Sequence, residues 1–258
     1  MATIDLEKIS DLPIKLNKNS LEFGKRMKKV VPEARTHKRM LPVLKNPEEK
    51  APEEFYYMYR DVAIESDREL IRKNNLRFDI TILPPFLVGD EYNKTFGHYH
   101  PKVPGTFLGG ATWWPEIYEV LHGRAHYLLQ NGSEFLVFDA RPGDKCVMLP
   151  GFGHITVNPS GKEALVMANW VFPGFASDYG PIEKLGGGQW FETTKGFVAN
   201  KKYGEAPNVQ LISPRDFEEF GFSNSRPMYA DAIANPAKFE WLSKPQNYLE
   251  LFKKYRET

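Results

Sequence analysis

Two histidines that lie two residues apart, His98 and His100, are the most suggestive side chains in this chain of 258 residues. In a β-strand alternate side chains share one face, so the two imidazoles are expected to point to the same side. Imidazoles paired in this way can bind a divalent metal when a carboxylate and a third imidazole join them. Glu116 and His154 are the candidates for these further ligands.

The strand expected at residues 116–121 offers two carboxylates, Glu116 and Glu119. Because they are three residues apart, they face opposite sides of the strand and only one can point inward. Hydrophobicity does not choose between them. The distance from Glu116 to the turn glycine Gly123 resembles the first sequence motif of cupin proteins, which favours Glu116 as the ligand. Glu119 is expected to be solvent-facing or salt-bridged.

His154 belongs to a second pattern, in which a glycine turn, a strand and a proline bend precede the histidine and Asn158 follows it by four residues. This order resembles the second cupin motif. Three imidazoles and one carboxylate suit Fe²⁺, Mn²⁺, Ni²⁺, Zn²⁺ or Co²⁺ and leave one or two coordination positions open for a substrate. His122 and His126 are expected at a hairpin, exposed to solvent.

The elements that would position these residues are short strands separated by turns. Residues 77–83 alternate in character, with Phe78, Ile80 and Ile82 on one face. Asn131-Gly132 between two apolar runs predicts a hairpin. About eight such strands at regular spacing predict an all-β protein with a jelly-roll barrel.

The chain is expected to divide into three parts. Residues 1–70 would form an N-terminal extension that packs on the barrel, residues 71–182 the cupin barrel, and residues 183–258 a C-terminal extension with short helices. Ser213 to Asp216 reads as the start of a short helix, with serine as the N-cap and proline in the first turn. Asn247 to Tyr255 reads as an amphipathic terminal helix.

From about Tyr56 to Ile182 the chain resembles one cupin family, the archaeal-type metal-dependent glucose-6-phosphate isomerases. The resemblance rests on Thr95 to His100, Glu116 to Tyr118, Leu128 to Gln130, Pro142-Gly143, Pro150, His154 to Asn158, and Asp178 to Ile182. It implies interconversion of glucose 6-phosphate and fructose 6-phosphate, a step of glycolysis and gluconeogenesis. A phosphosugar substrate and one divalent metal per subunit, with Fe²⁺ expected first, are implied as well.

The resemblance also implies roles for single residues. The metal ligands would be His98, His100, Glu116 and His154. The residues around the sugar phosphate would be Tyr56, Thr81, Thr95, Gly97, Tyr118 and Tyr179. Glu116 and Tyr179 are the candidate catalytic residues.

Two chemical routes remain open at this point. In an enediol route a base removes a proton from C2, and Glu116 is the candidate, provided that one of its oxygens is free. In a hydride route the hydrogen passes from C2 to C1 and no base is needed. Deuterium placed at C2 would be lost to water in the first route and retained in the second.

Other functions also remain open. A cupin dioxygenase or decarboxylase would use the same metal ligands, but it would not need the phosphate cradle of Thr95, Gly97 and Tyr179. An isomerase of another phosphosugar, such as mannose 6-phosphate, and a non-catalytic sugar-binding cupin are further alternatives.

The chain departs from the implied family in three places. Fifteen residues separate His100 from Glu116, so residues 101–115 would be an insertion that forms a lid or a dimer contact. Phe172 and Ser177 stand where family members often have tyrosine and histidine. These changes bear on the substrate more than on the metal.

The composition argues against several classes of protein. Thirty-four basic and 33 acidic residues leave a formal net charge of +1, which gives no electrostatic reason to expect nucleic acid. No stretch approaches the ~20 apolar residues that a membrane span needs. The N-terminus has no apolar run behind a basic patch, so we expect no signal peptide. The single cysteine, Cys146, fits a reducing compartment, so we expect a cytoplasmic protein, and we expect a homodimer.

Overall fold

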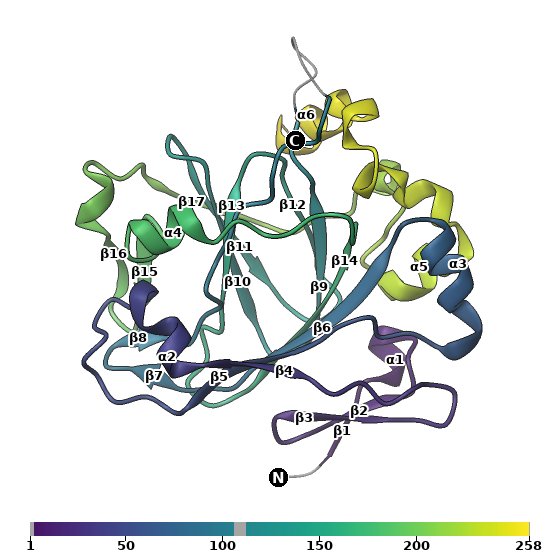
Figure 1. Ribbon diagram of the computed structural model, residues 1–258, viewed down its shortest axis with the longest axis horizontal. Coiled ribbons are helices and arrows are strands. Elements are labelled where there is room, and N and C mark those ends of the chain that lie inside the picture. The colour runs from purple at the N-terminus through teal and green to yellow at the C-terminus, as the bar shows by residue number, and fades with distance from the viewer. Residues whose placement is uncertain (1–2, 106–111, 258) are drawn as a thin grey trace.

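The computed structural model describes residues 3–105 and 112–257, and two β-sheets that form a barrel lie at its centre (Figure 1). The larger sheet has six strands, each antiparallel to its neighbours. In spatial order they are β12 (Lys145–Met148), β9 (Glu116–His122), β14 (Leu165–Val171), β6 (Arg77–Leu83), β5 (Glu54–Tyr59) and β4 (Glu33–Thr36).

The smaller sheet faces it. Its strands are β13 (Gly153–Val157), β10 (Ala125–Gln130), β11 (Phe135–Ala140) and β17 (Val209–Ile212), and only β17 runs parallel to its neighbour, β11. The segment 94–98 continues this sheet beyond β13 through two isolated bridges, from Lys94 to Val157 and from His98 to His154.

The chain passes back and forth between the two sheets. It runs from β6 to the segment 94–98, then to β9, to the hairpin of β10 and β11, and on through β12, β13 and β14. Eight strands that alternate between two sheets in this manner form a jelly roll. The prediction of an all-β cupin jelly-roll barrel with flanking extensions is therefore confirmed.

The side chains of β6 alternate between apolar and polar because the two faces of the larger sheet have different neighbours. The ring centroid of Phe78 lies 4.7 Å from that of Trp170 and 5.2 Å from that of Tyr229. Tyr229 belongs to α5 (Met228–Ala234), so the C-terminal part of the chain covers the outer face of this sheet. The alternate side chains of the same strands point into the barrel, and many of them are polar.

The remaining elements lie around the barrel. One small sheet contains β1 (Ile4–Asp5), β2 (Ile14–Asn17) and β3 (Ser20–Phe23). Another contains β7 (Leu87–Val88), β8 (Glu91–Tyr92), β15 (Trp190–Thr193) and β16 (Gly196–Ala199). The helices are α1 (Glu7–Ser10), α2 (His37–Met40), α3 (Arg68–Lys73), α4 (Gly180–Lys184) and α6 (Leu249–Glu257). Short 3₁₀ turns are η1 (Leu41–Val43), η2 (Glu65–Asp67), η3 (Lys201–Tyr203), η4 (Glu218–Phe220), η5 (Pro236–Leu242) and η6 (Pro245–Asn247). None of the helices in residues 3–105 and 112–257 has the length and apolar character needed to cross a membrane.

The extensions differ in part from the expectation. The terminal helix α6 forms where it was predicted, but the helix predicted to start at Ser213 is absent. The Asp216 carboxylate instead accepts a hydrogen bond from the backbone N–H of Asn224, which ties this segment into a loop. The division at residues 70 and 182 stays a prediction. Strands β4, β5 and β17, from outside 71–182, join the two barrel sheets.

Candidate metal centre

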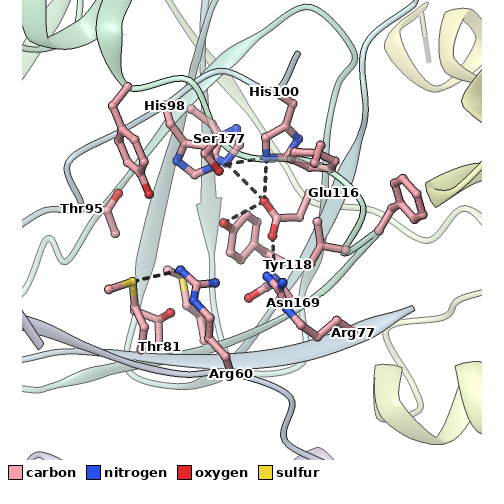
Figure 2. Close-up of a pocket in the computed structure, with 18 of the residues that line it drawn as sticks. Arg60, Arg77, Thr81, Thr95, His98, His100, Glu116, Tyr118, Asn169 and Ser177 are labelled. Carbon is pink, nitrogen blue, oxygen red and sulfur yellow. Dashed lines mark hydrogen bonds and ion pairs between the residues drawn. The ribbon is translucent and has the colours of Figure 1, made fainter. Parts of the chain in front are cut away.

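A pocket inside the barrel brings the predicted site residues together (Figure 2). Its lining includes every residue assigned above to metal or substrate: Tyr56, Thr81, Thr95, Gly97, His98, His100, Glu116, Tyr118, His154 and Tyr179. Phe172 and Ser177, two of the three departures from the implied family, line it as well. The inward faces of β5, β6, β14 and β9 supply much of this lining, so the larger sheet forms the floor of the pocket.

The three histidines and the glutamate form one compact group. Each offers one ligand atom, and these four atoms all lie within 4.8 Å of one another. The Nε2 atoms of His98 and His100 are 3.2 Å apart, and Glu116 Oε2 lies 3.5 Å from His100 Nε2 and 3.4 Å from His154 Nε2. Such a group can hold a metal ion.

Backbone pairing places the imidazoles, though not as a regular strand. The expectation that His98 and His100 lie in one continuous strand is wrong, because the segment forms only isolated bridges. His98 N–H donates to His154 O at 3.2 Å and His154 N–H donates to His98 O at 2.9 Å. Tyr99 bonds to Asp178 instead. The alternation of the extended chain is kept, and His100 returns to the side of His98 (Figure 2).

Gly97 is required by this close approach of two chain segments. Its φ of +81° lies in the left-handed region that glycine favours. A Cβ atom at this position would lie 2.4 Å from Cγ1 of Ile155 on β13. Only glycine therefore lets the chain that carries His98 and His100 lie against β13.

The protonation of the group suits a cation. His100 Nδ1–H donates to the carbonyl oxygen of Trp114 at 2.9 Å, which leaves the Nε2 lone pair for the cluster. Burial lowers the pKa of His98 well below 6.5, and burial, opposed by Glu116, lowers the pKa of His100 to about 4. Burial raises the pKa of Glu116, but the imidazoles of His154 and His100 beside it outweigh this and lower the pKa. Neutral imidazoles and an ionised carboxylate are the forms that bind metals.

The two oxygens of Glu116 have different partners. Oε2, which faces the imidazoles, accepts a hydrogen bond from the Tyr118 hydroxyl at 3.1 Å. Oε1 points away from them and accepts the Asn169 side-chain amide at 2.5 Å. His154 Nε2 is buried and has no hydrogen-bond partner among the described residues. An unpaired buried nitrogen is costly, and a cation bound at Nε2 would remove that cost, so the residues fit a divalent metal.

Hydroxyl groups line the pocket near the histidines. The Tyr56 oxygen accepts hydrogen bonds from Arg35 Nε at 3.1 Å and from Phe96 N at 3.3 Å, which leaves its own proton free to be donated. Thr95 Oγ1 accepts from the backbone of β13 at 2.9 Å and is in the same position to donate. The Tyr179 ring lies 5.4 Å from the His98 ring, between centroids. These donors could bind an anionic or hydroxylated ligand beside the metal group.

Three polar pocket residues were not predicted from the sequence: Arg60, Arg77 and Asn169. The period of two in β-strands places Arg60 and Arg77 on the inward face, but it does not mark them as site residues. Arg60 lies four residues after Tyr56 in line with β5, and Arg77 lies four residues before Thr81 on β6, so each shares a face with a predicted pocket residue.

Other candidate side chains lie outside the pocket. The expectation that His126 is solvent-exposed is wrong, because its side chain is 13% exposed and Nδ1 lies 2.7 Å from Glu192 Oε1. His122, with a side chain 19% exposed, pairs with a carboxylate at 3.2 Å and is also largely covered. Glu119 faces the outer side of β9 and is salt-bridged to Lys145 at 2.8 Å, one of its two expected states.

The segment 101–115 lies against the metal group where it is described. Trp114 is 9% exposed, and its ring packs 4.4 Å from that of Phe172, between centroids. Lys102 and Trp113 form an isolated bridge that closes the two ends of the segment. The role of this segment as a lid or dimer contact stays a prediction, and its residues 106–111 lie outside the described part of the chain.

The family model and the curated relatives that match this chain in sequence carry the same name. A family model described as "Glucose-6-phosphate isomerase (GPI)" matches residues 35–208. Among curated proteins, the glucose-6-phosphate isomerase of Thermococcus gammatolerans is 34% identical over 140 residues, which cover 54% of this chain and 67% of the relative. That of Thermococcus litoralis is 31% identical over 131 residues, or 50% of this chain and 62% of the relative.

Among solved structures the similarity is distant. A recombinant oxalate oxidase in complex with glycolate has a TM-score of 0.37 and 14% sequence identity, with 62% of this chain and 64% of that chain covered. A structure of oxalate decarboxylase has a TM-score of 0.36 and 13% identity, with 63% of this chain and 36% of that chain covered.

Proposed function

This chain belongs to the glucose-6-phosphate isomerase family, and we propose that it interconverts glucose 6-phosphate and fructose 6-phosphate in the barrel pocket. One observation carries the proposal: the four possible metal ligands and the hydroxyl donors line the same pocket, within the residues that match the family. Two relatives that match about half of this chain carry the activity in their names.

The proposed metal would be held by the imidazoles of His98, His100 and His154 and by Oε2 of Glu116. We propose Fe²⁺, with Mn²⁺, Ni²⁺, Zn²⁺ and Co²⁺ as alternatives that the same donor set suits. When bound, such an ion supplies Lewis-acid chemistry, because it polarises sugar oxygens and stabilises negative charge on them. The unpaired Nε2 of His154 and the neutral imidazoles of His98 and His100 support this assignment.

The hydroxyl groups would bind the rest of the substrate. In this proposal the hydroxyls of Tyr56, Thr81, Thr95 and Tyr179 and the backbone N–H of Gly97 donate hydrogen bonds to the sugar phosphate. Hydrogen bonds from Arg35 and Phe96 support this role of Tyr56. Their N–H groups donate to the Tyr56 oxygen, so its own proton can be donated to a ligand. Tyr118 bonds to the metal-facing oxygen of Glu116 and would keep that carboxylate in place.

Isomerisation of the aldose must move one hydrogen from C2 to C1 and one proton from O2 to O1. Glu116 is poorly placed to act as the base, because Asn169 and Tyr118 donate to its two oxygens and its pKa is lowered. We therefore propose that C2 passes hydride directly to C1, while the Tyr179 hydroxyl carries the proton from O2 to O1. Substrate deuterated at C2 should then retain its label, and loss of most deuterium to water would contradict this route.

The experiment that tests the function is an isomerase assay in both directions on the purified chain, before and after chelation and with each metal added back. We expect activity that disappears with the metal and returns with it. A His98→Gln variant should lose activity, whereas His122→Gln, a histidine outside the pocket, should keep it. Activity that survives complete metal removal would contradict the proposal.

Two further parts of the proposal come from the sequence. A homodimeric state and a cytoplasmic location stay predictions. Light scattering on the purified chain would check the first, and fractionation of cells would check the second.

A further inference from the structure

Arg60 is a charged pocket residue that no step proposed above uses. It follows β5 and shares its inward side with Tyr56 and Met58. Its side chain is 44% exposed, and Figure 2 shows it on the floor of the pocket, across from His98 and His100. Its purpose is therefore open.

The arginines of the pocket share one carboxylate unequally. Arg77 binds the buried Asp79 with two donors, Nε at 3.0 Å and Nη2 at 2.8 Å. The backbone N–H of Asp61 donates to the same carboxylate at 2.9 Å. Arg60 contributes a single bond, from Nη1 to Oδ2 at 3.0 Å. Because Arg77 already matches the charge of Asp79, Arg60 is a second positive charge beside this carboxylate.

Most hydrogen-bond donors of Arg60 remain available. A guanidinium has five N–H donors, and in the described part of the chain Arg60 uses one on Asp79 and one on Met58 Sδ, at 3.4 Å. Thioether sulfur is a weak acceptor, so the second contact is easily replaced. Burial lowers the pKa of Arg60, but Asp79, Tyr179 and Glu116 raise it above its ordinary value, and the side chain is charged.

The position of this charge matches the hydroxyl donors. Met58, which Arg60 contacts, is the cross-strand neighbour of Thr81, and Figure 2 places Arg60 beside Thr81. Neutral hydroxyls alone leave a phosphate dianion without a countercharge, whereas a guanidinium offers paired donors that match phosphate oxygens. Arg60 and the hydroxyl of Thr81 thus lie together on the floor of the pocket, across from His98 and His100.

We propose that Arg60 binds the phosphate group of the sugar phosphate, beside Thr81, and thereby sets the preference of the pocket for phosphorylated sugars. The identity of the sugar rests on the proposed function, but the phosphate contact does not. A purely structural alternative is that Arg60 only fixes Asp79 to the end of β5. The two roles predict different effects on ligand affinity and on metal affinity.

The test is titration calorimetry on the full chain loaded with Mn²⁺, with inorganic phosphate and with fructose 6-phosphate as ligands. In Arg60→Gln both dissociation constants should rise about 10- to 100-fold, the range expected for a lost bond to a charged group. Arg60→Lys, which keeps the charge but not the fork, should fall between. The affinity for Mn²⁺ should stay unchanged.

Arg124→Gln is the matched control, since Arg124 also pairs with an aspartate, Asp139, but lies outside the pocket. It should bind both ligands as the unaltered chain does. The proposal is overturned if Arg60→Gln retains its phosphate affinity, or if the unaltered chain binds no phosphate. It is also overturned if Arg60→Gln loses Mn²⁺ and phosphate together while Arg60→Lys restores neither.

Failure of this inference differs from failure of the proposed function. A chain that isomerises glucose 6-phosphate with the same KM in Arg60→Gln has the function without this contact. A chain that shows no isomerase activity, but loses phosphate binding in Arg60→Gln, has the contact and another function.

Discussion

At the scale of single residues, the two oxygens of Glu116 have separate tasks. Oε2 faces three imidazoles and accepts from Tyr118, while Oε1 is held by Asn169 at 2.5 Å. Groups that orient a ligand in this way commonly affect metal affinity about 10- to 100-fold. Asn169 should therefore position Glu116 without touching the metal itself.

Asn169→Ala should weaken metal affinity about 10- to 100-fold and lower kcat, because Glu116 loses the bond that fixes its orientation. Metal titration followed by rate measurements at saturating metal would measure both effects. Asn131→Ala is the control, since among the described residues that exposed side chain bonds within its own turn. Unchanged metal affinity in Asn169→Ala would contradict this role.

The metal ligands could be predicted from spacing and motifs, whereas the hydroxyl residues of the pocket were implied only by the family resemblance. Alternation put His98 and His100 on one side, and the distance to a turn glycine separated Glu116 from Glu119. Arg60 and Asn169 could not be singled out in the same way. Charged and amide residues near strand ends usually face solvent, and only the pairing of β5, β6 and β14 turns them inward.

At the scale of elements, the segment 94–98 decides whether the site forms. It lies close enough to β13 that a Cβ on Gly97 would come within 2.4 Å of Ile155 Cγ1. Gly97→Ala should lower the free energy of unfolding by about 2 kcal/mol or more and reduce metal affinity, because the segment must move away from β13. Thermal unfolding with and without metal would measure this.

Gly132→Ala separates the clash from the backbone strain. Gly132 also has a positive φ, of +96°, but no atom lies within 4 Å of its missing Cβ. It should cost only about 1 kcal/mol and leave metal affinity intact. Equal effects of the two substitutions would show that the contact with Ile155 is unimportant.

Most barrel strands could be predicted from their turns, since glycine, proline and Asn-Gly pairs limit the runs that became β9 to β14. Local sequence patterns gave wrong predictions where contacts between residues far apart in the sequence determine the structure. Ser213 and Pro214 resemble a helix start, but Asp216 bonds to Asn224 and holds a loop. His126 follows a turn, yet Glu192 from β15 covers it.

At the scale of the whole molecule, burial of His100 inside the barrel makes the free energy of unfolding depend on pH. The buried His100 has a pKa of about 4 in the folded chain, while an unfolded histidine has one of about 6.5. Between these values the unfolded state binds more protons, so folding stability is lost as the pH falls. The loss can reach about 1.4 kcal/mol per pH unit for one such group.

Metal-free protein should therefore lose stability relative to metal-free His100→Gln as the pH falls from about 6.5 to about 4. Denaturant unfolding of both proteins across this range measures the difference, and groups far from His100 cancel. A difference that stays constant with pH would contradict the neutral, buried state of His100.

The central claim is that His98, His100, Glu116 and His154 hold one metal at which glucose 6-phosphate is isomerised. The most direct measurement is to add Fe²⁺ stepwise, without oxygen, to chelator-stripped protein and to record the isomerase rate at each step. The rate should rise from zero in proportion to the metal and level off at one equivalent per chain, and His154→Gln should show no such rise. Full activity in the stripped protein, or no activity at any metal content, would contradict the account.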